Sequence, residues 1–281
     1  MKVIETISEM RRACRLRPSE SKLGLVPTMG ALHEGHLSLV RAARAKTDVA
    51  TVSIFVNPTQ FGPNEDFSRY PRNLESDCAL LEREDVNYVF APSAEEMYPP
   101  SGAATWITVE GLSDRLCGKS RPGHFRGVAT VVAKLFNVVE PDIAFFGQKD
   151  AAQVAVIKRM VRDLNLPVAI EVCPIIRESD GLALSSRNAY LSPDERKMAL
   201  VLYASLQRAQ KAFGDGERDA AKIASEAKKA FVWQPAARLD YFEVVDPESL
   251  EPVDAINKSS LVAVAAYIGN TRLIDNIILE P

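Results

Sequence analysis

Short apolar runs alternate with segments of helical periodicity along the first two thirds of the chain. Five of these runs are rich in strand-forming residues, and several end at proline or at a turn, which is typical of buried strands: residues 22–27, 48–56, 87–92, 142–146 and 168–172. Apolar residues recur at helical spacing in the segments between them, which are residues 37–44, 74–84, 127–139 and 150–165. This alternation predicts βαβ units and an α/β fold, a Rossmann-like, doubly wound and mainly parallel sheet.

The pattern changes after about residue 175. A capping box at residues 192–195 predicts a helix that runs to about residue 213, and a second helix is predicted over residues 218–231. Three further runs predict strands at residues 239–245, 261–268 and 273–279. Two helices followed by three strands indicate a smaller C-terminal α+β domain. We therefore divide the chain into domains of residues 1–184 and 185–281.

Composition and charge restrict the class of function. The 281 residues include 37 acidic and 34 basic ones, for a net charge of −3, whereas a domain that binds nucleic acid is usually strongly basic. The sequence has no apolar run of about 18 residues that could span a membrane, and its start lacks a signal-like apolar core. We expect a cytoplasmic protein that binds neither nucleic acid nor a membrane.

Four scattered cysteines and three histidines give little support for a protein-bound metal. No two cysteines form a C-x-x-C pair, so buried free thiols are the favoured interpretation. The histidines are His33, His36 and His124, and a three-histidine metal site would have to draw on all of them. We therefore assign no residue as a metal ligand.

Polar segments follow three of the predicted strands, at residues 28–36, 57–60 and 147–150. Ligands of doubly wound sheets bind outside the carboxyl ends of the strands, so we expect these segments to meet at one site. In the first segment two glycines allow close backbone approach, while His33 and His36 lie at the start of a helix, where backbone N–H groups favour an anion. As imidazolium or as neutral donors, both could stabilise charge on phosphate. The alternative is a pair of surface histidines.

Two further clusters supply cations and hydroxyls. Lys149 could reach a polyphosphate from a helix start, while Asp150 caps that helix or meets a ribose hydroxyl. Near the domain boundary, Ser185, Ser186 and Arg187 suit phosphate oxygens. A solvated lysine and a serine-rich linker are the alternative interpretations.

Three neutral amides could orient a small polar substrate by hydrogen bonds: Asn57, Gln60 and Gln153. Phe55, Val131 and Val132 could form an apolar wall beside them. Each amide could equally cap a loop or a helix, so both interpretations stay open.

Other phosphate-binding motifs are absent or incomplete. The sequence has no G-x-G-x-x-G, and the Gly-Lys-Ser at residues 118–120 lacks the glycine that a P-loop needs at position 113, which is Ser113. Lys119, Arg121 and Arg126, around residues 122–124, are expected to form a basic loop or an interface segment.

Five segments together resemble the pantothenate synthetase family, the pantoate–β-alanine ligases, within the class I nucleotidyltransferases that carry an HxGH signature. The resemblance rests on residues 27–36, with residues 33–36 as the signature, and on residues 57–61, 121–127, 146–150 and 184–188. It implies an AMP-forming carbon–nitrogen ligase that condenses (R)-pantoate with β-alanine. ATP would convert pantoate into a pantoyl-adenylate with release of pyrophosphate, and β-alanine would then displace AMP to form pantothenate.

The same resemblance implies roles for individual residues. Catalytic roles fall to His33, His36, Lys149 and Arg187. The residues implied in ATP binding are Met29, Gly30, Ala31, Leu32, His33, Glu34, Gly35, His36, Gly147, Gln148, Lys149, Asp150, Ile176, Leu184, Ser185, Ser186 and Arg187. Asn57, Gln60 and Gln153 are implied in binding pantoate, with Gln60 also serving β-alanine.

The resemblance also implies Mg²⁺ carried by ATP, with Asp77 as a candidate contact, a homodimer formed through the main domain, and a small domain that acts as a lid. Three other functions remain open from the residues alone. They are an HxGH enzyme that transfers a nucleotidyl group to a phosphorylated substrate, a class I aminoacyl-tRNA synthetase, and a non-catalytic nucleotide-binding protein.

Overall fold

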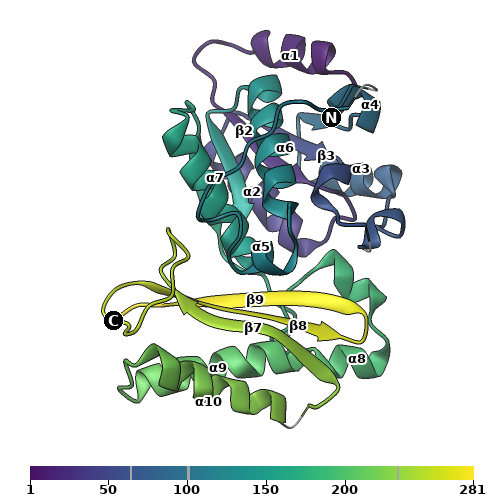
Figure 1. The fold of residues 1–281 in the computed structure, drawn as a ribbon. Helices are drawn as coiled ribbons and strands as arrows, with labels where there is room; N and C mark the ends of the chain where they lie inside the picture. The colour runs from purple at the N-terminus through teal and green to yellow at the C-terminus, as the bar shows by residue number, and fades with distance from the viewer. Residues whose placement is uncertain (64, 100–101, 233) are drawn as a thin grey trace.

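The computed structural model describes residues 1–63, 65–99, 102–232 and 234–281. It has a large α/β layer formed by the N-terminal part of the chain and a smaller layer of three strands and helices formed by the C-terminal part (Figure 1). Within the described residues, none of the helices combines the length and the apolar character that crossing a bilayer requires.

Six parallel strands form the sheet of the large layer, in the order β1-β4-β3-β2-β5-β6. Their bounds are β1 Lys2–Ile4, β2 Leu23–Thr28, β3 Val49–Ile54, β4 Tyr88–Phe90, β5 Ile143–Gly147 and β6 Ala169–Cys173. The five predicted strands are all present, and the structure adds the edge strand β1, which the sequence pattern did not predict. The register aligns Thr28 with Ile54 and Gly147 with Cys173, so neighbouring strands end at one edge of the sheet.

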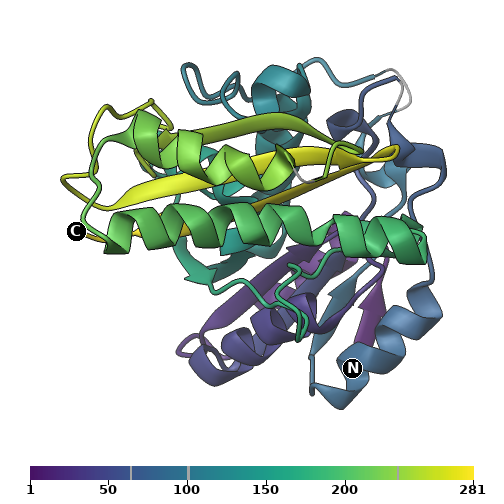
Figure 2. The same ribbon diagram turned by 90° about the horizontal axis from the view of Figure 1, so that it is seen from below.

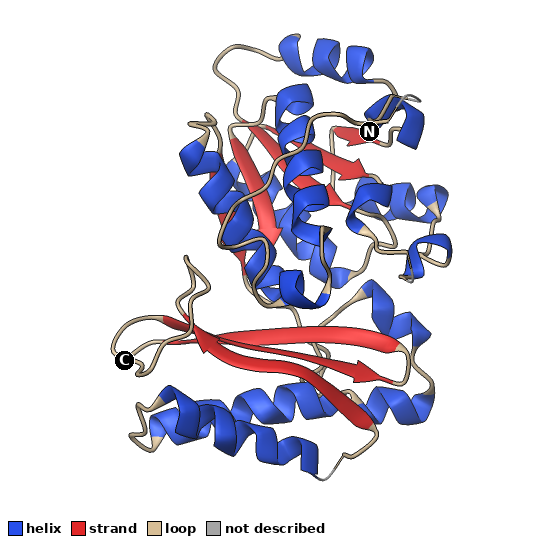
Figure 3. Ribbon diagram, viewed as in Figure 1, coloured by secondary structure: helices blue, strands red, loops and turns tan. Residues whose placement is uncertain are grey.

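Helices cover both faces of this sheet, as a doubly wound fold requires (Figure 3). Helices α2 (Glu34–Lys46) and α3 (Leu74–Arg83) pack on one face around buried residues such as Val40 and Leu81. Helices α1 (Ile7–Arg15), α6 (His124–Val139) and α7 (Ala151–Asp163) pack into the main core on the other face. The winding direction reverses between β2 and β5, and a crevice for a ligand is expected at that point.

Short helices and 3₁₀ turns occupy the connections of the large layer. The α-helices are α4 (Ala94–Met97) and α5 (Cys117–Ser120), and the 3₁₀ turns are η1 (Pro58–Gln60), η2 (Asp66–Ser68) and η3 (Gln148–Asp150). Turn η1 follows β3, and η3 links β5 to α7, so both lie at the carboxyl edge of the sheet.

The C-terminal layer is an antiparallel sheet covered by helices on one side. Its strands are β7 (Ala237–Val245), β8 (Ser260–Ile268) and β9 (Thr271–Leu279), in the order β7-β8-β9. Helices α9 (Leu200–Gly214) and α10 (Ala220–Val232) lie across one face, and the other face turns toward the large layer (Figures 1 and 2). The predicted helix 192–213 is present as α8 (Pro193–Met198) and α9, with Ala199 between them in right-handed helical conformation.

A fourth 3₁₀ turn, η4 (Ser186–Tyr190), connects the two layers. It follows the segment that leaves β6 and precedes α8, whose predicted capping box is present between Ser192 and Glu195. The predicted α/β class and the smaller α+β unit are therefore confirmed, while the division at residues 184 and 185 stays a prediction.

Candidate active site

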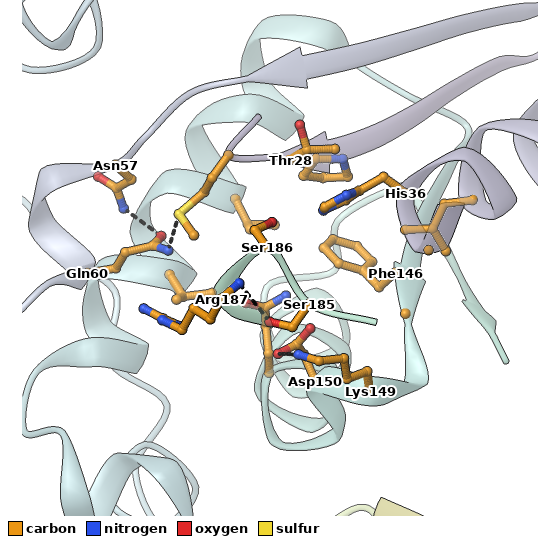
Figure 4. Close-up of a pocket in the computed structure, with 18 of the residues that line it drawn as sticks. Thr28, His36, Asn57, Gln60, Phe146, Lys149, Asp150, Ser185, Ser186 and Arg187 are labelled. Carbon is orange, nitrogen blue, oxygen red and sulfur yellow. Dashed lines mark hydrogen bonds and ion pairs between the residues drawn. The ribbon is translucent and has the colours of Figure 1, made fainter. Parts of the chain in front are cut away.

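A cleft lies at the carboxyl edge of the large sheet, where the turns after its strands meet the segment that leads to the small layer (Figure 4). Most of the predicted site residues line it: Met29, His33, Gly35, His36, Asn57, Gln60, Gly147, Lys149, Asp150, Gln153, Ile176, Leu184, Ser185, Ser186 and Arg187. The predicted apolar wall of Phe55, Val131 and Val132 is part of the same cleft. The structure thus brings together groups that lie more than 150 positions apart in the sequence.

The turn after β2 has an unusual backbone. Gly30 and Ala31 both have positive φ angles, of 81° and 50°. The carboxylate of Asp77, on α3, accepts hydrogen bonds from the N–H groups of Ala31 at 2.9 Å and Leu32 at 2.8 Å. A Cβ on Gly30 would lie 2.9 Å from an oxygen of Asp77, so glycine suits both the angle and the space. Asp77, considered above only as a magnesium contact, therefore holds the turn in place.

His33 and His36 use one ring nitrogen each to begin helix α2. Nδ1 of His33 accepts a hydrogen bond from the N–H of Gly35 at 3.1 Å. Nδ1 of His36 accepts from the N–H of His33 at 3.3 Å, and the two contacts form a capping box. Because both Nδ1 atoms accept, each neutral ring carries its proton on Nε2. The two rings lie 4.1 Å apart and can donate Nε2–H to a ligand.

All three histidines of the chain are held neutral. Burial, and then Lys149, lower the pKa of His33 to about 4. Burial, followed by His33 and Lys149, lowers the pKa of His36 to about 3. Burial and Arg121 lower the pKa of His124 to about 3. Of the two forms considered from the sequence, neutral donors are therefore the ones present at neutral pH.

We expect the free energy of unfolding to fall steeply as the pH falls below about 6.5, the ordinary histidine pKa. Between pH 5 and 6 the unfolded chain binds up to three more protons than the folded one, because three histidine pKa values are lowered. Stability therefore rises with pH by up to about 4 kcal/mol per unit in this window, and the contribution is fully present above pH 6.5.

Urea unfolding at pH 5.0, 5.5, 6.0 and 7.5 measures this slope. Replacing His124 with Asn removes one titrating group, and the slope of that variant is expected to be about 1.4 kcal/mol per unit shallower. A free energy of unfolding that stays constant from pH 5.5 to 7.5 would contradict the neutral assignment.

Two predicted cations line the cleft, each beside a carboxylate. Lys149 lies in η3, and its Nζ is 3.7 Å from a carboxylate oxygen of Asp150. Arg187 lies in η4 and donates to both carboxylate oxygens of Asp66, at 3.0 and 2.8 Å. Burial alone would raise the pKa of Asp66, but the Arg187 guanidinium outweighs it and holds this pKa below its usual value.

Arg121 and His124, in the segment expected to form a basic loop or an interface, also line the cleft. Arg121 donates to both carboxylate oxygens of Glu65, at 2.7 and 2.5 Å. His124 donates from Nδ1 to the carbonyl of Gln60 at 2.8 Å, so its Nε2 accepts from Arg121 at 2.9 Å. Sequence analysis missed this role because the partners, at positions 60 and 65, are far from residues 121 and 124 in the chain.

The amides of Asn57 and Gln60 belong to one hydrogen-bonded group. Asn57 donates to the side-chain oxygen of Gln60 at 3.2 Å, and its own oxygen accepts from Tyr98 at 2.9 Å. It also donates to the carbonyl of Gly127 at 3.2 Å. A Cβ on Gly127 would lie 2.3 Å from the carbonyl oxygen of Thr59, so the glycine lets α6 approach η1 this closely.

Five residues predicted to bind ATP do not line the cleft: Gly30, Ala31, Leu32, Glu34 and Gln148. The carboxylate of Glu34 is paired with Arg41 on the surface of α2. The side chain of Gln148 donates to Asn276 on β9 at 3.0 Å. Any contact of these two residues with a nucleotide would have to come from the backbone, and it stays a prediction.

Carboxylates are few in the cleft. Among the described residues, no group of three or more His, Cys, Asp and Glu side chains could hold a metal ion. Asp150 lines the cleft and is half exposed, whereas both oxygens of Asp77 are taken by the backbone of the turn after β2. A Mg²⁺ ion here would be held mainly by oxygens of a bound substrate, and Asp150 is the candidate protein contact.

Comparisons with known proteins agree on one family. The family model described as pantoate-beta-alanine ligase matches residues 2–278. The pantothenate synthetase of Koribacter versatilis is 58% identical over 100% of this chain and 96% of its own length. The pantothenate synthetase of Thermotoga petrophila is 59% identical over 99% of this chain and 100% of its own length.

Two solved structures are similar over nearly all of the chain. Pantothenate synthetase from Thermus thermophilus has a TM-score of 0.95 at 47% identity, with 100% of both chains covered. The pantoate-β-alanine ligase of Francisella tularensis, complexed with β-γ ATP and β-alanine, has a TM-score of 0.81 at 36% identity, with 99% of this chain and 97% of that chain covered.

Proposed function

This chain belongs to the pantoate–β-alanine ligase family, and from that premise we propose how its own residues carry out the reaction. The protein is an ATP-dependent ligase that condenses (R)-pantoate with β-alanine to give pantothenate, AMP and pyrophosphate. The observation that supports our assignment of residues is the meeting of two imidazoles, two cations and three amides around one cleft.

The triphosphate of ATP lies among the polar groups at the switch point of the sheet. His33 and His36 donate Nε2–H to phosphate oxygens, which needs no change in their protonation. Lys149 approaches from η3, while Ser185, Ser186 and Arg187 approach from the segment that enters the small domain. The adenine lies against the backbone of Ile176, which follows β6 at the edge of the cleft.

Pantoate lies on the other side of the α-phosphate, against Asn57, Gln60 and Gln153. The amides of Gln60 and Gln153 bind its hydroxyls and carboxylate, whereas Asn57, whose two amide hydrogens go to Gln60 and Gly127, orients Gln60. Phe55, Val131 and Val132 contact its methyl groups. Its carboxylate oxygen attacks the α-phosphorus, the bond to the bridging oxygen of the β-phosphate breaks, and pyrophosphate leaves. This orientation, with donors already placed on the phosphates, lowers the barrier without a proton transfer from the enzyme.

β-Alanine then attacks the acyl carbon of the pantoyl-adenylate through its neutral amine. The amide bond forms, the bond to the phosphate oxygen breaks, and AMP leaves with the electron pair. The proton released from the attacking nitrogen passes to the AMP phosphate or to solvent. Gln60 serves this second substrate as well, because its side chain lines the cleft while its backbone carbonyl is held by Arg121 and His124. The walls of the cleft, with the segment 184–187 on one side, keep water away from the mixed anhydride.

Mg²⁺ enters as part of the ATP substrate. Its charge neutralises phosphate oxygens, and the carboxylate of Asp150, half exposed beside Lys149, is the protein group placed to contact it. The lack of a multi-carboxylate cluster among the described residues fits an ion that is held mainly by the triphosphate.

The decisive experiment is pantoate-dependent exchange of labelled pyrophosphate into ATP. We expect exchange with ATP, Mg²⁺ and pantoate in the absence of β-alanine, and AMP accumulation only when β-alanine is added. A non-catalytic nucleotide-binding protein would bind ATP without exchange. An enzyme that modifies a phosphorylated substrate, or an aminoacyl-tRNA synthetase, would show no dependence on pantoate.

We further propose a cytoplasmic homodimer in which residues 185–281 form a lid over the main domain. Four free thiols, three of them buried, support a reducing compartment. Light scattering coupled to gel filtration tests the dimer, with an expected mass of twice 30.9 kDa, about 62 kDa. A mass near 31 kDa at assay concentration would contradict it.

A further inference from the structure

Strand β9 of the small layer carries two adjacent buried polar residues in an otherwise largely apolar sequence. Asp275 is 3% exposed and Asn276 is 2% exposed. Because side chains alternate along a strand, the two point to opposite faces of the sheet. The face of Asp275 also carries Leu273 and belongs to the small-layer core, whereas the face of Asn276 also carries Ile274 and packs on the main core.

Asn276 makes three hydrogen bonds to the turn that carries Lys149. Its side-chain NH₂ group donates to the carbonyl oxygens of Gln148 at 3.0 Å and of Lys149 at 2.9 Å. Its side-chain oxygen accepts from Nε2 of Gln148 at 3.0 Å. Turn η3 has no side-chain cap within its own segment. The hydrogen bonds from Asn276 therefore hold the turn from the neighbouring layer.

Asp275 holds the segment that follows the neighbouring strand β6. It accepts two hydrogen bonds from Arg177, at 2.6 and 2.9 Å, and its side chain is almost fully buried. Arg177 also donates to the carbonyl of Gly181 at 3.0 Å, and its guanidinium lies over the ring of Tyr203, 4.4 Å from the centroid. Arg177 directly follows Ile176, so this pair fixes the backbone proposed to contact adenine.

We propose that Asp275 and Asn276 are positioning residues for ATP. From one strand of the small domain, Asn276 fixes the position of the Lys149 turn and Asp275 fixes that of the Ile176 segment. Docking of the small domain and assembly of the nucleotide site are then a single event. The inference rests on the proposed placement of ATP along these two segments. Neither residue touches the reacting atoms, and both act through the groups that they hold.

The test compares three variants of the full chain in the pyrophosphate exchange assay. Asn276→Ala removes all three hydrogen bonds, and we expect a rise of at least about tenfold in the KM for ATP with a lower kcat, because a displacement of about 1 Å in a reacting group can lower rates a hundredfold. The KM for pantoate is expected to stay within about twofold of wild type, since Asn57 and Gln60 follow β3 and make their hydrogen bonds to each other and to Gly127, with none to Asn276.

Asn276→Asp separates hydrogen bonding from packing. The carboxylate keeps the shape and the acceptor for Gln148 but has no donor for the two carbonyl oxygens, so we expect it to be at least as impaired as Asn276→Ala. A role in packing alone would leave it close to wild type. Asn257→Ala, at an exposed position of the same domain, is the matched control and is expected to behave as wild type.

Each outcome decides between the possibilities. Wild-type protein without pantoate-dependent exchange would overturn the proposed function itself. Active wild type together with a folded Asn276→Ala variant of unchanged KM for ATP would overturn the positioning role, and so would an equal rise of both KM values. If Asn276→Ala melts below the assay temperature, Asn276→Ser keeps one donor, and the same selective rise in the KM for ATP is expected in a smaller amount.

Discussion

Replacement of His36 with alanine is expected to lower the rate of pantoate-dependent exchange by about a hundredfold or more, as the loss of a preorganised donor to transition-state charge does elsewhere. The ring is buried and neutral, and its Nδ1 is occupied by the N–H of His33, so Nε2–H is the group left to meet phosphate. The loss should appear mainly in kcat, because charge on the transferred phosphorus develops in the transition state.

Two amide variants separate the roles of the two ring nitrogen atoms of His36, the phosphate donor Nε2 and the helix-capping Nδ1. Gln places an NH₂ group near the position of Nε2, so His36→Gln is expected to retain part of the rate. Asn places its oxygen near the position of Nδ1, so His36→Asn keeps the helix cap but loses the phosphate donor. Equal rates for the two variants, or a folded His36→Ala with wild-type exchange, would remove His36 from the proposed mechanism.

Replacement of Arg187 with alanine is also expected to lower exchange by about a hundredfold, because it removes the partly buried guanidinium that we propose to contact phosphate. The KM for ATP should rise at the same time. Arg187→Lys keeps the charge but not the planar pair of donors, and an intermediate rate is expected.

The control for this variant is Asp66, which Arg187 contacts in the structure. Arg187→Ala leaves the Asp66 carboxylate unpaired beside the phosphates, and that charge alone could repel ATP. The double variant Arg187→Ala/Asp66→Ala removes it. If Arg187 acts on phosphate, the double variant remains as impaired as Arg187→Ala, whereas recovery to within about threefold of wild type would assign the loss to the unpaired carboxylate.

The fold was largely predictable because its signals are local. Each of the five predicted strands is a compact apolar run that ends in a turn, and the capping box at Ser192 marks the helix start that the structure contains. Strand β1 has only three residues, and its partner β4 is more than 80 positions away, so no local pattern marks it. Helix α1 was not predicted either, although Ile7, Met10 and Cys14 recur at helical spacing and Thr6 caps the helix.

The site was predictable where it follows directly from strand ends, and not where it depends on distant partners. Residues 28–36, 57–60 and 147–150 follow strands and converge as expected. Arg121, by contrast, reaches the cleft wall only because Glu65 and the carbonyl of Gln60 hold its guanidinium. The sequence did contain a signal for the role of Asn276. Asp275 and Asn276 form a polar pair inside an apolar strand, and buried polar side chains need hydrogen-bond partners.

Paired charges in the ligand-free cleft determine how nucleotide binding responds to salt. Arg187, Arg121 and Lys149 each lie against a carboxylate, of Asp66, Glu65 and Asp150. An incoming phosphate therefore has to replace a carboxylate as the partner of each cation, because none of these three cations is unpaired. ATP affinity should consequently weaken only gradually with ionic strength, and the attraction that speeds the first encounter should be modest until Asp66 has released Arg187.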